Sequence, residues 1–444
     1  MGNLKVHDKL DIQAGGQVEV LDEFGSGGQG TVYKVSYNGK TYALKWYHPG
    51  VFKGKENDFY KNLENNISNG APTDAFLWPK AITKVYNDQF GYLMDVRPSG
   101  YEELTNFFVG GRKQKQARFK SFYALCTAAI NIIEAFRALH NNGYSYQDIN
   151  NGNFFINPEN GDVLICDNDN VSPFGTNLGI MGKQRWMAPE IVMGKNDPDK
   201  NSDRFSLAVV LFRLLFINHP LEGRYSTPPC MTKEAEQKYY GSAPIFVYDP
   251  STTENRPIPG TDHNLKLFWN VYPDYVKEAF IRAFSHDVMM KQKPRILEKE
   301  WMDIFIRLRT EIGRCPYCGQ ETFYTFKGSH DIPCMECGKK IPITNALQIK
   351  NQILPIFPGL KISLWTVDSS LEDIRTQVAE VVKNPKDPKL LGFRNLSQRT
   401  WSINLPDGSQ RPLRHSKLYP FALDLKSISL VERMILESSS KRER

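Results

Sequence analysis

The chain reads Gly25-Ser26-Gly27-Gly28-Gln29-Gly30-Thr31-Val32-Tyr33-Lys34-Val35 near its start, a glycine-rich turn that runs into an alternating apolar pattern. The residues after the third glycine distinguish a dinucleotide-binding domain from a β-hairpin. In a dinucleotide-binding domain the glycine-rich turn continues into a helix. Here residues 31–37 alternate as a β-strand does, after a strand-like run at 18–24. The stretch therefore predicts a β-hairpin whose glycines let backbone N–H groups approach phosphates closely.

A lysine lies beyond this hairpin on the next strand-like run, residues 40–47. The segment Tyr42-Ala43-Leu44-Lys45 places the ammonium group fifteen residues after Gly30. A lysine in this position supplies a point charge for phosphate oxygens. We also expect a helix over residues 58–67 and a further strand over 91–96.

Two polar motifs lie further along the chain. The first, Tyr146-Gln147-Asp148-Ile149-Asn150-Asn151-Gly152-Asn153, holds a carboxylate and an amide five residues apart. The second, Cys166-Asp167-Asn168-Asp169, ends a strand-like run at 162–165. Carboxylate and amide oxygens are ligands that suit Mg²⁺.

Apolar periodicity predicts helices beyond residue 101. Phe122, Leu125, Ala129, Ile132, Phe136 and Leu139 recur every three or four residues, which predicts one face of a long helix. Residues 207–217 are apolar nearly all round, which predicts a buried helix. Met187-Ala188-Pro189-Glu190 and Ser202-Asp203 precede that run.

In these motifs the chain resembles the protein kinase family, over about residues 15–310. The resemblance implies ATP as the phosphoryl donor and Asp148 as the group that accepts or orients the proton of the attacking hydroxyl. It implies Asn153 and Asp167 as Mg²⁺ ligands, and Lys45 as the contact to the α- and β-phosphates.

The same resemblance implies the remaining nucleotide contacts. Lys45 is expected to pair with a helix glutamate, for which we prefer Glu64 to Glu56. The backbone of Asp95–Arg97 is expected to form the hinge, and Asp203 to brace the catalytic loop. The other implied contacts are the phosphate loop Gly25, Ser26, Gly27, Gly28, Gln29 and Gly30, the adenine-facing Val32, Ala43 and Phe155, and Met94 at the back of the pocket.

The chain departs from the kinase pattern in its catalytic loop. Tyr146-Gln147 replaces His-Arg, so no arginine is available to pair with a phosphate on the activation loop. Activity is therefore expected not to require phosphorylation of that loop. Asn150 stands where most Ser/Thr kinases carry a lysine, and Lys183 either restores that charge from the other side or is a solvated loop residue.

Two further departures concern the structure around the loop. Asn168-Asp169 replaces Phe-Gly, which removes a glycine hinge and makes a flip of this segment less expected. Lys293-Pro294 replaces Arg-Pro, so we expect a weakened or absent ion pair to Glu190, because lysine lacks the planar fork of arginine.

Four cysteines come after the helical region in a C-x₂-C-x₁₅-C-x₂-C pattern. They are Cys315, Cys318, Cys334 and Cys337, and a glycine follows the second cysteine of each pair. Each pair can present two thiolates to one metal, so the pattern predicts a Cys₄ zinc site. Because protein fills all four positions, the zinc would be structural.

The last hundred residues are rich in β-branched residues and turn signals, which predicts a mainly β domain with one amphipathic helix near 371–382. Around residues 392–401 the chain resembles the domain behind the zinc ribbon in some bacterial kinases of tellurium-resistance-type neighbourhoods. There a von Willebrand-type protein and an antagonistic metal-dependent phosphatase are neighbours and possible partners. The domain is either a docking or bracing module or a phosphopeptide reader that uses Arg394, Ser397 and Arg399.

Composition and charge limit the kinds of partner that the chain can bind. The net charge is +7, and residues 341–444 hold 16 Lys and Arg against 10 Asp and Glu, so the excess gathers there. This argues against a nucleic-acid partner for the whole chain. A basic run at 111–120 is either a solvated face or a docking site for an acidic substrate. No secretory signal or membrane-spanning run is found, so we expect no membrane partner and a cytoplasmic location.

Together these features predict an α+β fold, a bilobal protein kinase followed by a zinc ribbon and a small β domain. The expected function is transfer of the γ-phosphoryl of Mg-ATP to a Ser/Thr hydroxyl of a protein, with autophosphorylation. An ATP-binding pseudokinase scaffold, and a nucleotidyl transferase or small-molecule kinase, remain alternatives. The expected divisions are an N-lobe at 1–95, a C-lobe at 96–310, a zinc ribbon at 311–340, an accessory domain at 341–437 and a flexible tail at 438–444.

Overall fold

The computed structural model describes residues 4–108, 116–228, 230–325, 331–343, 345–350, 352–385, 387, 390–404 and 410–420. Residues 111–115 of the predicted basic run and the whole predicted tail at 438–444 lie outside these residues. The chain divides into two compact units. Unit 1 comprises Met1–Lys120, Thr127–Asn270 and Lys277–Met302, and unit 2 comprises Ser121–Cys126, Val271–Val276 and Asp303–Arg444.

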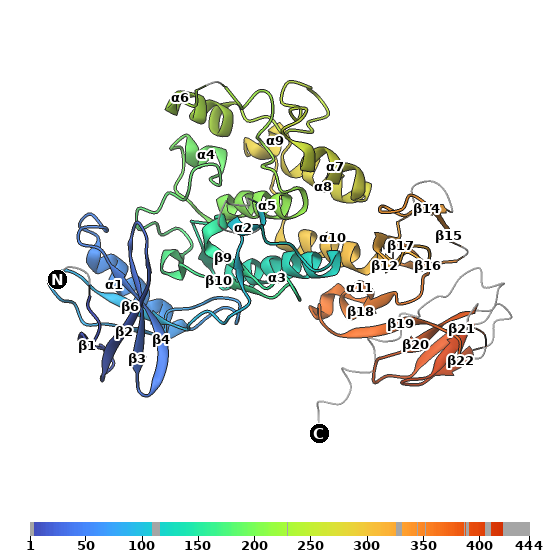
Figure 1. Ribbon diagram of the computed structural model, residues 1–444, viewed down its shortest axis with the longest axis horizontal. Helices are drawn as coiled ribbons and strands as arrows, with labels where there is room; N and C mark the ends of the chain where they lie inside the picture. Colours follow the sequence, from blue (N-terminus) through green and yellow to red (C-terminus); the bar gives the residue numbers. More distant parts are fainter. Residues whose placement is uncertain are drawn as a thin grey trace. The chain divides into compact units, whose positions relative to one another are not determined.

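An antiparallel sheet opens unit 1, with the strand order β1-β2-β3-β4-β6-β5 (Figure 1). Its strands are β1 (Lys9–Asp11), β2 (Gln17–Ser26), β3 (Gly30–Tyr37), β4 (Lys40–Tyr47), β5 (Ala81–Ile82) and β6 (Gly91–Met94). The strands predicted over 18–24, 31–37, 40–47 and 91–96 are confirmed.

The two faces of this sheet bury different clusters, because successive side chains of a strand point to opposite faces. On β4, Leu44 and Trp46 join one cluster, while Ala43 and Tyr47 join the other. The second cluster also contains Phe59 and Leu63 of the helix α1 (Glu56–Asn69), which was predicted over 58–67. Helix α1 therefore covers the face of the sheet that carries Lys45.

Helices dominate the chain between residues 105 and 310. The predicted long helix is α3 (Phe122–Asn141), and the predicted buried helix is α5 (Lys200–Phe216), whose first turn is closed by a capping box between Asp199 and Ser202. Helix α3 is apolar and long enough to span a membrane, but 61% of its most apolar window is buried inside the structure. The other helical elements are α2 (Thr105–Phe108), α4 (Pro189–Val192), α6 (Lys233–Gln237), the π-helical turn η3 (Lys238–Ser242), α7 (His263–Val271), α8 (Asp274–Ala283), α9 (His286–Met289) and α10 (Glu298–Thr310).

Short strands between α3 and α4 position the polar motifs. Strands β9 (Phe154–Ile156) and β10 (Val163–Ile165) pair with Phe154 opposite Ile165, so the residues just before β9 and just after β10 are neighbours. This pairing brings Asn153 and Asp167 to the same end of the hairpin. The other elements of this region are β8 (Tyr144–Ser145), the 3₁₀ turns η1 (Asn151–Asn153) and η2 (Asn168–Asn170), and β11 (Ser172–Pro173). Strand β7 (Glu102–Glu103), which precedes α3, pairs with β9.

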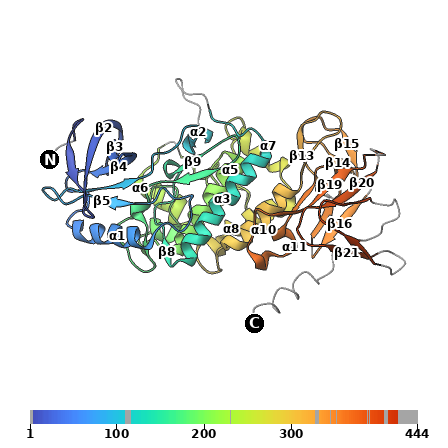
Figure 2. The same ribbon diagram turned by 90° about the horizontal axis from the view of Figure 1, so that it is seen from below.

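Unit 2 is built mainly of antiparallel strands (Figure 2). A central sheet has the order β18-β19-β20-β23, and hairpins pair β12 with β13, β14 with β15, β16 with β17 and β21 with β22. The elements are β12 (Ile312–Arg314), β13 (Glu321–Phe323), β14 (Asp331–Pro333), β15 (Lys340–Pro342), β16 (Ala346–Ile349), β17 (Gln352–Pro355), β18 (Lys361–Ser363), α11 (Leu364–Val367), η4 (Ser369–Leu371), β19 (Gln377–Lys383), β20 (Leu391–Asn395), β21 (Trp401–Asn404), β22 (Gln410–Leu413) and β23 (Leu418–Pro420).

The amphipathic helix predicted near 371–382 is wrong, because half of that segment, residues 377–382, lies in strand β19. Strand β19 pairs on both sides, with β18 and β20. Its valines, including the buried Val378 and Val381, are β-branched and favour a strand that is covered by neighbours.

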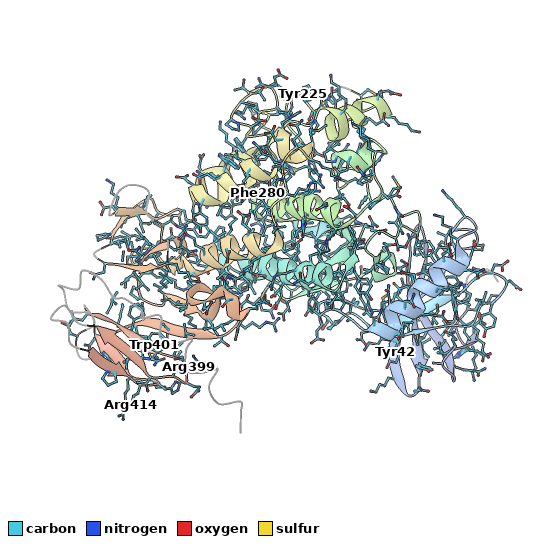
Figure 3. All side chains as sticks on the ribbon, turned by 180° about the vertical axis from the view of Figure 1, so that it is seen from behind. Tyr42, Tyr225, Phe280, Arg399, Trp401 and Arg414 are labelled. Atoms are coloured by element: carbon cyan, nitrogen blue, oxygen red, sulfur yellow. The ribbon has the colours of Figure 1, made fainter. Side chains whose placement is uncertain are left out.

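One hydrophobic core runs through unit 2. Cys315 and Cys334 belong to the same buried cluster as Leu347, Val381 and Trp401. The Cys-rich hairpins and the β-sheet therefore share one core instead of having separate ones. Figure 3 labels Trp401, the first residue of β21, and Arg399 in the loop that precedes it.

Candidate active site

The predicted phosphate loop is the tip of the β2–β3 hairpin. Within it the Gly27 N–H donates to Gly30 O at 2.9 Å. A Cβ on Gly30 would lie 2.4 Å from Trp46 O of β4, so only glycine fits there. His48 approaches from β4, with its Nε2 3.1 Å from Gly27 O, and its N–H donates to Gln29 O at 2.9 Å. The loop is thereby tied to the strand that carries Lys45.

Lys45 is buried at 5% exposure, on β4 under the glycine-rich loop. Its Nζ donates to Asp169 Oδ2 at 2.9 Å, lies 3.5 Å from Asp167 Oδ1, and donates to Gln29 Oε1 at 3.0 Å. Burial opposes its charge, but the Asp167 and Asp169 carboxylates outweigh this and raise the pKa of Lys45. The lysine is therefore a permanent cation.

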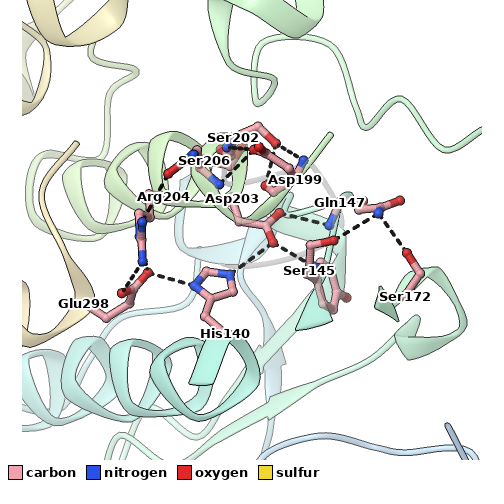
Figure 4. Close-up of polar contacts among 12 residues, drawn as sticks. His140, Ser145, Gln147, Ser172, Asp199, Ser202, Asp203, Arg204, Ser206 and Glu298 are labelled. Atoms are coloured by element: carbon pink, nitrogen blue, oxygen red, sulfur yellow. Dashed lines mark hydrogen bonds and ion pairs between the residues drawn. The ribbon is translucent and has the colours of Figure 1, made fainter. Parts of the chain in front are cut away.

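The catalytic-loop motif follows β8, and Asp203 of α5 holds it (Figure 4). Asp203 accepts the N–H of Tyr146 at 2.7 Å and that of Gln147 at 2.9 Å, which confirms its predicted bracing contact. The Tyr146 hydroxyl donates to Cys166 O, which joins this loop to the segment that carries Asp167. Burial raises the pKa of Asp148 to about 6.

The predicted Mg²⁺ ligands lie beside Asp148. Asn153 Nδ2 donates to Asp148 O at 2.9 Å, which leaves the amide oxygen of Asn153 as the atom able to face a cation. Asp167 has a left-handed backbone (φ 54°) and a side chain that is 37% exposed. One carboxylate and one amide oxygen at the end of one hairpin fit a hard divalent cation.

The residues predicted to contact adenine gather on β3, β4, β6 and β9. Ala43 pairs with Met94 across β4 and β6, and both join the core cluster against which Val32 packs. The Arg97 guanidinium lies 4.1 Å from the centre of the Phe155 ring. On the predicted hinge, Asp95 forms an exposed ion pair of 2.7 Å with Lys80.

The Lys45–Glu64 pair predicted from the sequence is not formed in the described structure. Glu64 Oε1 instead accepts a hydrogen bond from Gln13, and the rival Glu56 accepts one from the Gly54 N–H. The physical reason is the phase of α1, because its apolar positions Phe59 and Leu63 face the sheet and turn Glu64 away from Lys45.

The prediction of a weakened ion pair at Glu190 is also wrong. Arg295 supplies the planar fork, with its Nη1 and Nη2 donating to the two Glu190 oxygens at 2.9 and 2.7 Å. Both side chains are buried, at 6% and 7% exposure. Lys293 pairs with Asp287 instead, at 2.8 Å. The arginine that pairs with Glu190 therefore follows Pro294, whereas in the family pattern it precedes the proline.

Gln147 takes the place of the missing arginine with neutral hydrogen bonds (Figure 4). Its Nε2, which has two N–H donors, lies 3.0 Å from Ser145 Oγ, 2.8 Å from Ser172 Oγ and 2.7 Å from Thr176 O. The buried amide of Gln147 therefore holds the segment after Asp167 through neutral hydrogen bonds. In the family pattern an arginine at this position would form a charged pair. Lys183 Nζ donates to Asn151 Oδ1 at 3.0 Å, and its charge lowers the pKa of Asp148, a minor effect beside burial.

A buried charge network behind the catalytic loop was missed from the sequence (Figure 4). His140 of α3 contacts Asp203 Oδ2 at 3.1 Å and Glu298 Oε1 at 2.7 Å, and Arg204 Nε donates to Glu298 Oε1 at 2.8 Å. Burial lowers the pKa of His140, but the two carboxylates outweigh it and raise the pKa to about 9. A histidine near a helix end carries no spacing signal by itself.

The four predicted metal-binding cysteines come together in unit 2. Their sulfur atoms lie within 4.8 Å of one another. Two matching turns present them, with Gly319 N–H donating to Cys315 O and Gly338 N–H to Cys334 O, both at 2.9 Å. Both glycines have positive φ, at 73° and 69°, which explains the residue type after each pair. Four thiols at this spacing fit a tetrahedral zinc ion.

Unit 1 thus groups a glycine-rich hairpin and a buried lysine with oxygen ligands that suit a hard cation and with the carboxylate of Asp148, a set that suits phosphoryl transfer. A family model for the protein kinase domain matches residues 18–243, half of the chain, and the chain belongs to the protein kinase family.

Curated relatives agree with this assignment at low identity. The probable serine/threonine-protein kinase kinX of Dictyostelium discoideum is 26% identical over 211 residues, covering 45% of this chain and 18% of the relative. The serine/threonine-protein kinase SCH9 of Candida albicans is 26% identical over 200 residues, covering 43% and 24%. Stress-activated protein kinase alpha of Dictyostelium discoideum is 26% identical over 235 residues, covering 50% and 33%. The chain thus spans about a fifth of the length of the first two.

Proposed function

We propose that the chain is an ATP-dependent protein kinase that transfers the γ-phosphoryl of Mg-ATP to a Ser/Thr hydroxyl of a protein, and also to its own chain. One observation carries the proposal: the buried Lys45 lies 3.5 Å from Asp167, and Asn153, at the same end of the β9–β10 hairpin as Asp167, donates to the Asp148 backbone. Phosphoryl transfer needs positioning and charge neutralisation more than covalent chemistry, and this set supplies both. The family membership supports it independently.

Each residue has a proposed role that follows from its place. Asp148 orients the attacking hydroxyl and takes its proton, and Lys45 holds the α- and β-phosphates. When bound, Mg²⁺ neutralises the phosphate oxygens, and Asn153 and Asp167 would hold it. The glycine-rich loop, from Gly25 to Gly30, covers the phosphates. Val32, Ala43, Phe155, Met94 and the Asp95–Arg97 backbone surround the base.

Radiolabelled ATP separates the proposal from its alternatives. We expect label from [γ-³²P]ATP, but not from [α-³²P]ATP, on the chain itself and on a general protein acceptor such as casein. Asp148→Asn is expected to lower the rate by at least 100-fold while the affinity for Mg-ATP changes little. Label from the α position supports nucleotidyl transfer. Binding of ATP without any transfer supports a scaffold.

We also propose that unit 2 holds one structural zinc ion on Cys315, Cys318, Cys334 and Cys337. The four thiols fill every tetrahedral position, and Cys315 and Cys334 are buried in the core of the unit. The ion would therefore fix two hairpins and leave no open position for a substrate.

The C-terminal domain is proposed to dock or brace rather than to read phosphopeptides. Arg394 lies 3.5 Å from Glu380, and Ser397 Oγ contacts Asn395 Oδ1 at 2.8 Å and accepts the Trp401 indole N–H at 2.9 Å. A hydroxyl engaged on both sides is poorly placed to bind a phosphate.

The finer organisation is likewise a proposal. We infer an N-lobe at 1–95, a C-lobe at 96–310, a zinc ribbon at 311–340 and an accessory domain at 341–437. The resemblance to bacterial kinases of tellurium-resistance-type neighbourhoods supports a cytoplasmic protein. It also suggests a von Willebrand-type partner and an opposing metal-dependent phosphatase.

A further inference from the structure

Asp169 forms the closest contact of Lys45, although no motif assigns it a role. It lies in η2, two residues after Asp167, and is 1% exposed. Lys45 Nζ donates to both of its carboxylate oxygens, at 2.9 and 3.2 Å. The carboxylate expected from helix α1 is therefore supplied by the segment that carries the metal ligand.

Two tyrosines complete the surroundings of Asp169. The Tyr47 hydroxyl of β4 donates to Oδ2 at 2.6 Å, and the Tyr92 hydroxyl of β6 donates to Oδ1 at 3.1 Å. Burial, reinforced by the Asp169 charge, raises the pKa of both phenols well above their usual range, so they remain neutral donors. Each carboxylate oxygen thus accepts two hydrogen bonds, which compensates for burying the charge.

Helix α1 contacts the same segment by a different route. Its inward positions carry Asn62 and Asn66, whose Nδ2 atoms donate to Val171 O at 2.8 and 2.9 Å. Both asparagines are buried, whereas Glu64 bonds to Gln13 on the outer side. Helix α1 therefore binds the Val171 carbonyl, two residues after Asp169. It does not contact Lys45 through a carboxylate.

The backbone around Asp169 is fixed on its other side as well. Asn168 Nδ2 donates to Leu77 O and to Ile165 O, both at 2.9 Å. The flanking residues 168 and 171 are thus both anchored, which holds the Asp169 side chain under Lys45. On its remaining side Lys45 faces Gln29 and Asp167, the contacts nearest to where phosphates and metal would bind.

From this geometry we infer that Asp169 is the positioning residue for Lys45, and that it replaces the helix glutamate in this chain. The inference rests on the proposed function and deepens it. The anchor of the phosphate-binding lysine and the metal ligand Asp167 then belong to one rigid turn. Helix α1 contacts the segment that carries Asp169 at Val171, by way of Asn62 and Asn66.

The test compares Asp169→Asn with Glu64→Gln, using calorimetric Mg-ATP affinity and γ-phosphoryl transfer on the full chain. Asp169→Asn keeps the shape but removes the charge, so we expect Mg-ATP affinity to change at least 10-fold and kcat/KM to fall about 100-fold. Glu64→Gln is expected to stay within twofold in both. A larger loss in Glu64→Gln than in Asp169→Asn would overturn the inference.

A double-mutant cycle with Lys45→Met separates positioning from a merely structural role. If Asp169 acts through Lys45, the double variant transfers phosphate no more slowly than Lys45→Met alone. If the rate loss of the double variant instead equals the product of the two single losses, Asp169 only stabilises the fold, and the inference is overturned. Because Asp169→Asn can destabilise the chain, Tyr47→Phe serves as a milder variant that removes one hydroxyl from the same carboxylate. We expect it to lower kcat/KM several-fold, and an unchanged value counts against the inference.

Two readouts keep the inference and the proposed activity apart. A wild-type chain that binds Mg-ATP but transfers no label refutes the proposed kinase activity. In that case the affinities alone decide: a changed affinity in Asp169→Asn but not in Glu64→Gln supports the inference, and equal affinities refute it.

Discussion

The buried Asp148 carboxyl gives the proposed reaction a pH limit that an exposed aspartate would not. Its pKa is raised to about 6 by burial, and the Asn150 amide, which donates to Oδ1 at 3.1 Å, opposes this rise. Only the deprotonated form can take a proton from the attacking hydroxyl. We therefore expect kcat/KM to fall as the pH drops through about 6, measured as a pH–rate profile of phosphoryl transfer.

Asn150→Ala provides the matched variant for this pH limit. Losing its hydrogen bond removes a contact that lowers the pKa, so the acid limb should move to higher pH. An acid limb near pH 4 in the wild type, or one that does not move in the variant, would show that Asp148 does not control the rate.

The free energy of unfolding is expected to depend strongly on the side-chain shape at position 295, because of the Arg295–Glu190 pair. It is buried and bidentate, and Arg295 Nη1 also donates to Asn201 O at 2.7 Å. Arg295→Lys keeps the charge but loses the fork, so we expect a loss of about 2–4 kcal/mol in the free energy of unfolding. Lys293→Ala, at an exposed ion pair, should cost less than about 1 kcal/mol. Urea denaturation measures both, and equal losses would contradict the assignment.

At the scale of the element, the segment after Asp167 is held without any phosphate. Ser172 is fully buried, accepts from Gln147 Nε2, and donates to Thr176 O at 2.9 Å. The Thr176 contribution is a backbone carbonyl, which alanine retains. The double variant Ser172→Ala/Thr176→Ala should therefore lose only about 1 kcal/mol of stability and keep most of its γ-phosphoryl transfer.

Ser172→Glu is the contrasting variant, because it would bury an unpaired charge and cost several kcal/mol. Thermal unfolding and the radiolabel assay distinguish the two variants. If the double alanine variant were inactive but folded, phosphorylation of this segment would be required after all.

The His140 network links α3, α5 and α10 and predicts a stability change with pH. The pKa of His140 is raised to about 9, so its contribution is fully present below its usual pKa near 6.5 and is lost as the pH rises through about 9. The difference in pKa corresponds to a loss on the order of 3 kcal/mol.

Urea midpoints at pH 6.5 and 9.5 measure this loss. His140→Gln cannot titrate, so its stability should be lower at pH 6.5 and nearly flat between the two values. A wild-type protein as stable at pH 9.5 as at 6.5 would mean that His140 is neutral in the folded state.

Local spacing predicted the elements and much of the site, and helix phase explains the main failure. Lys45, Asp148 and Asn153 are each fixed by a motif within a few residues, so their places could be predicted. The partner of Lys45 depends on which face of α1 is buried. The spacing of Phe59 and Leu63 indicates that face, on which Asn62 and Asn66 lie and Glu64 does not. Asp169 and Arg295 could not be assigned because their partners lie more than 100 residues away in the sequence.

At the scale of the whole molecule, the two units have separate roles in the proposal. The kinase motifs all lie in unit 1, while the Cys cluster and the C-terminal sheet share one core in unit 2. The sequence predicted the ribbon and the β domain as consecutive modules. Their common core carries no sequence signal, because the buried residues that join them are single apolar side chains spread from Cys315 to Leu413.

This shared core predicts what metal removal does. Two of the four cysteines, Cys315 and Cys334, are themselves buried in the core, so losing the ion frees both hairpins that carry them. Cys318→Ser should reduce the zinc content from about one ion per chain to near zero. It should lower the thermal transition of unit 2 by roughly 10 °C or more. Mg-ATP affinity should change less than twofold, because the nucleotide-binding residues lie in unit 1.

Cys230→Ser, at an exposed cysteine outside the cluster, is the matched control and should change neither zinc content nor melting. Atomic absorption on the purified chain and differential scanning calorimetry with and without a chelator provide the readings. Loss of zinc with an unchanged melting profile would show that the core of unit 2 forms without the metal. In that case the cysteine cluster would bind an ion that the fold does not need.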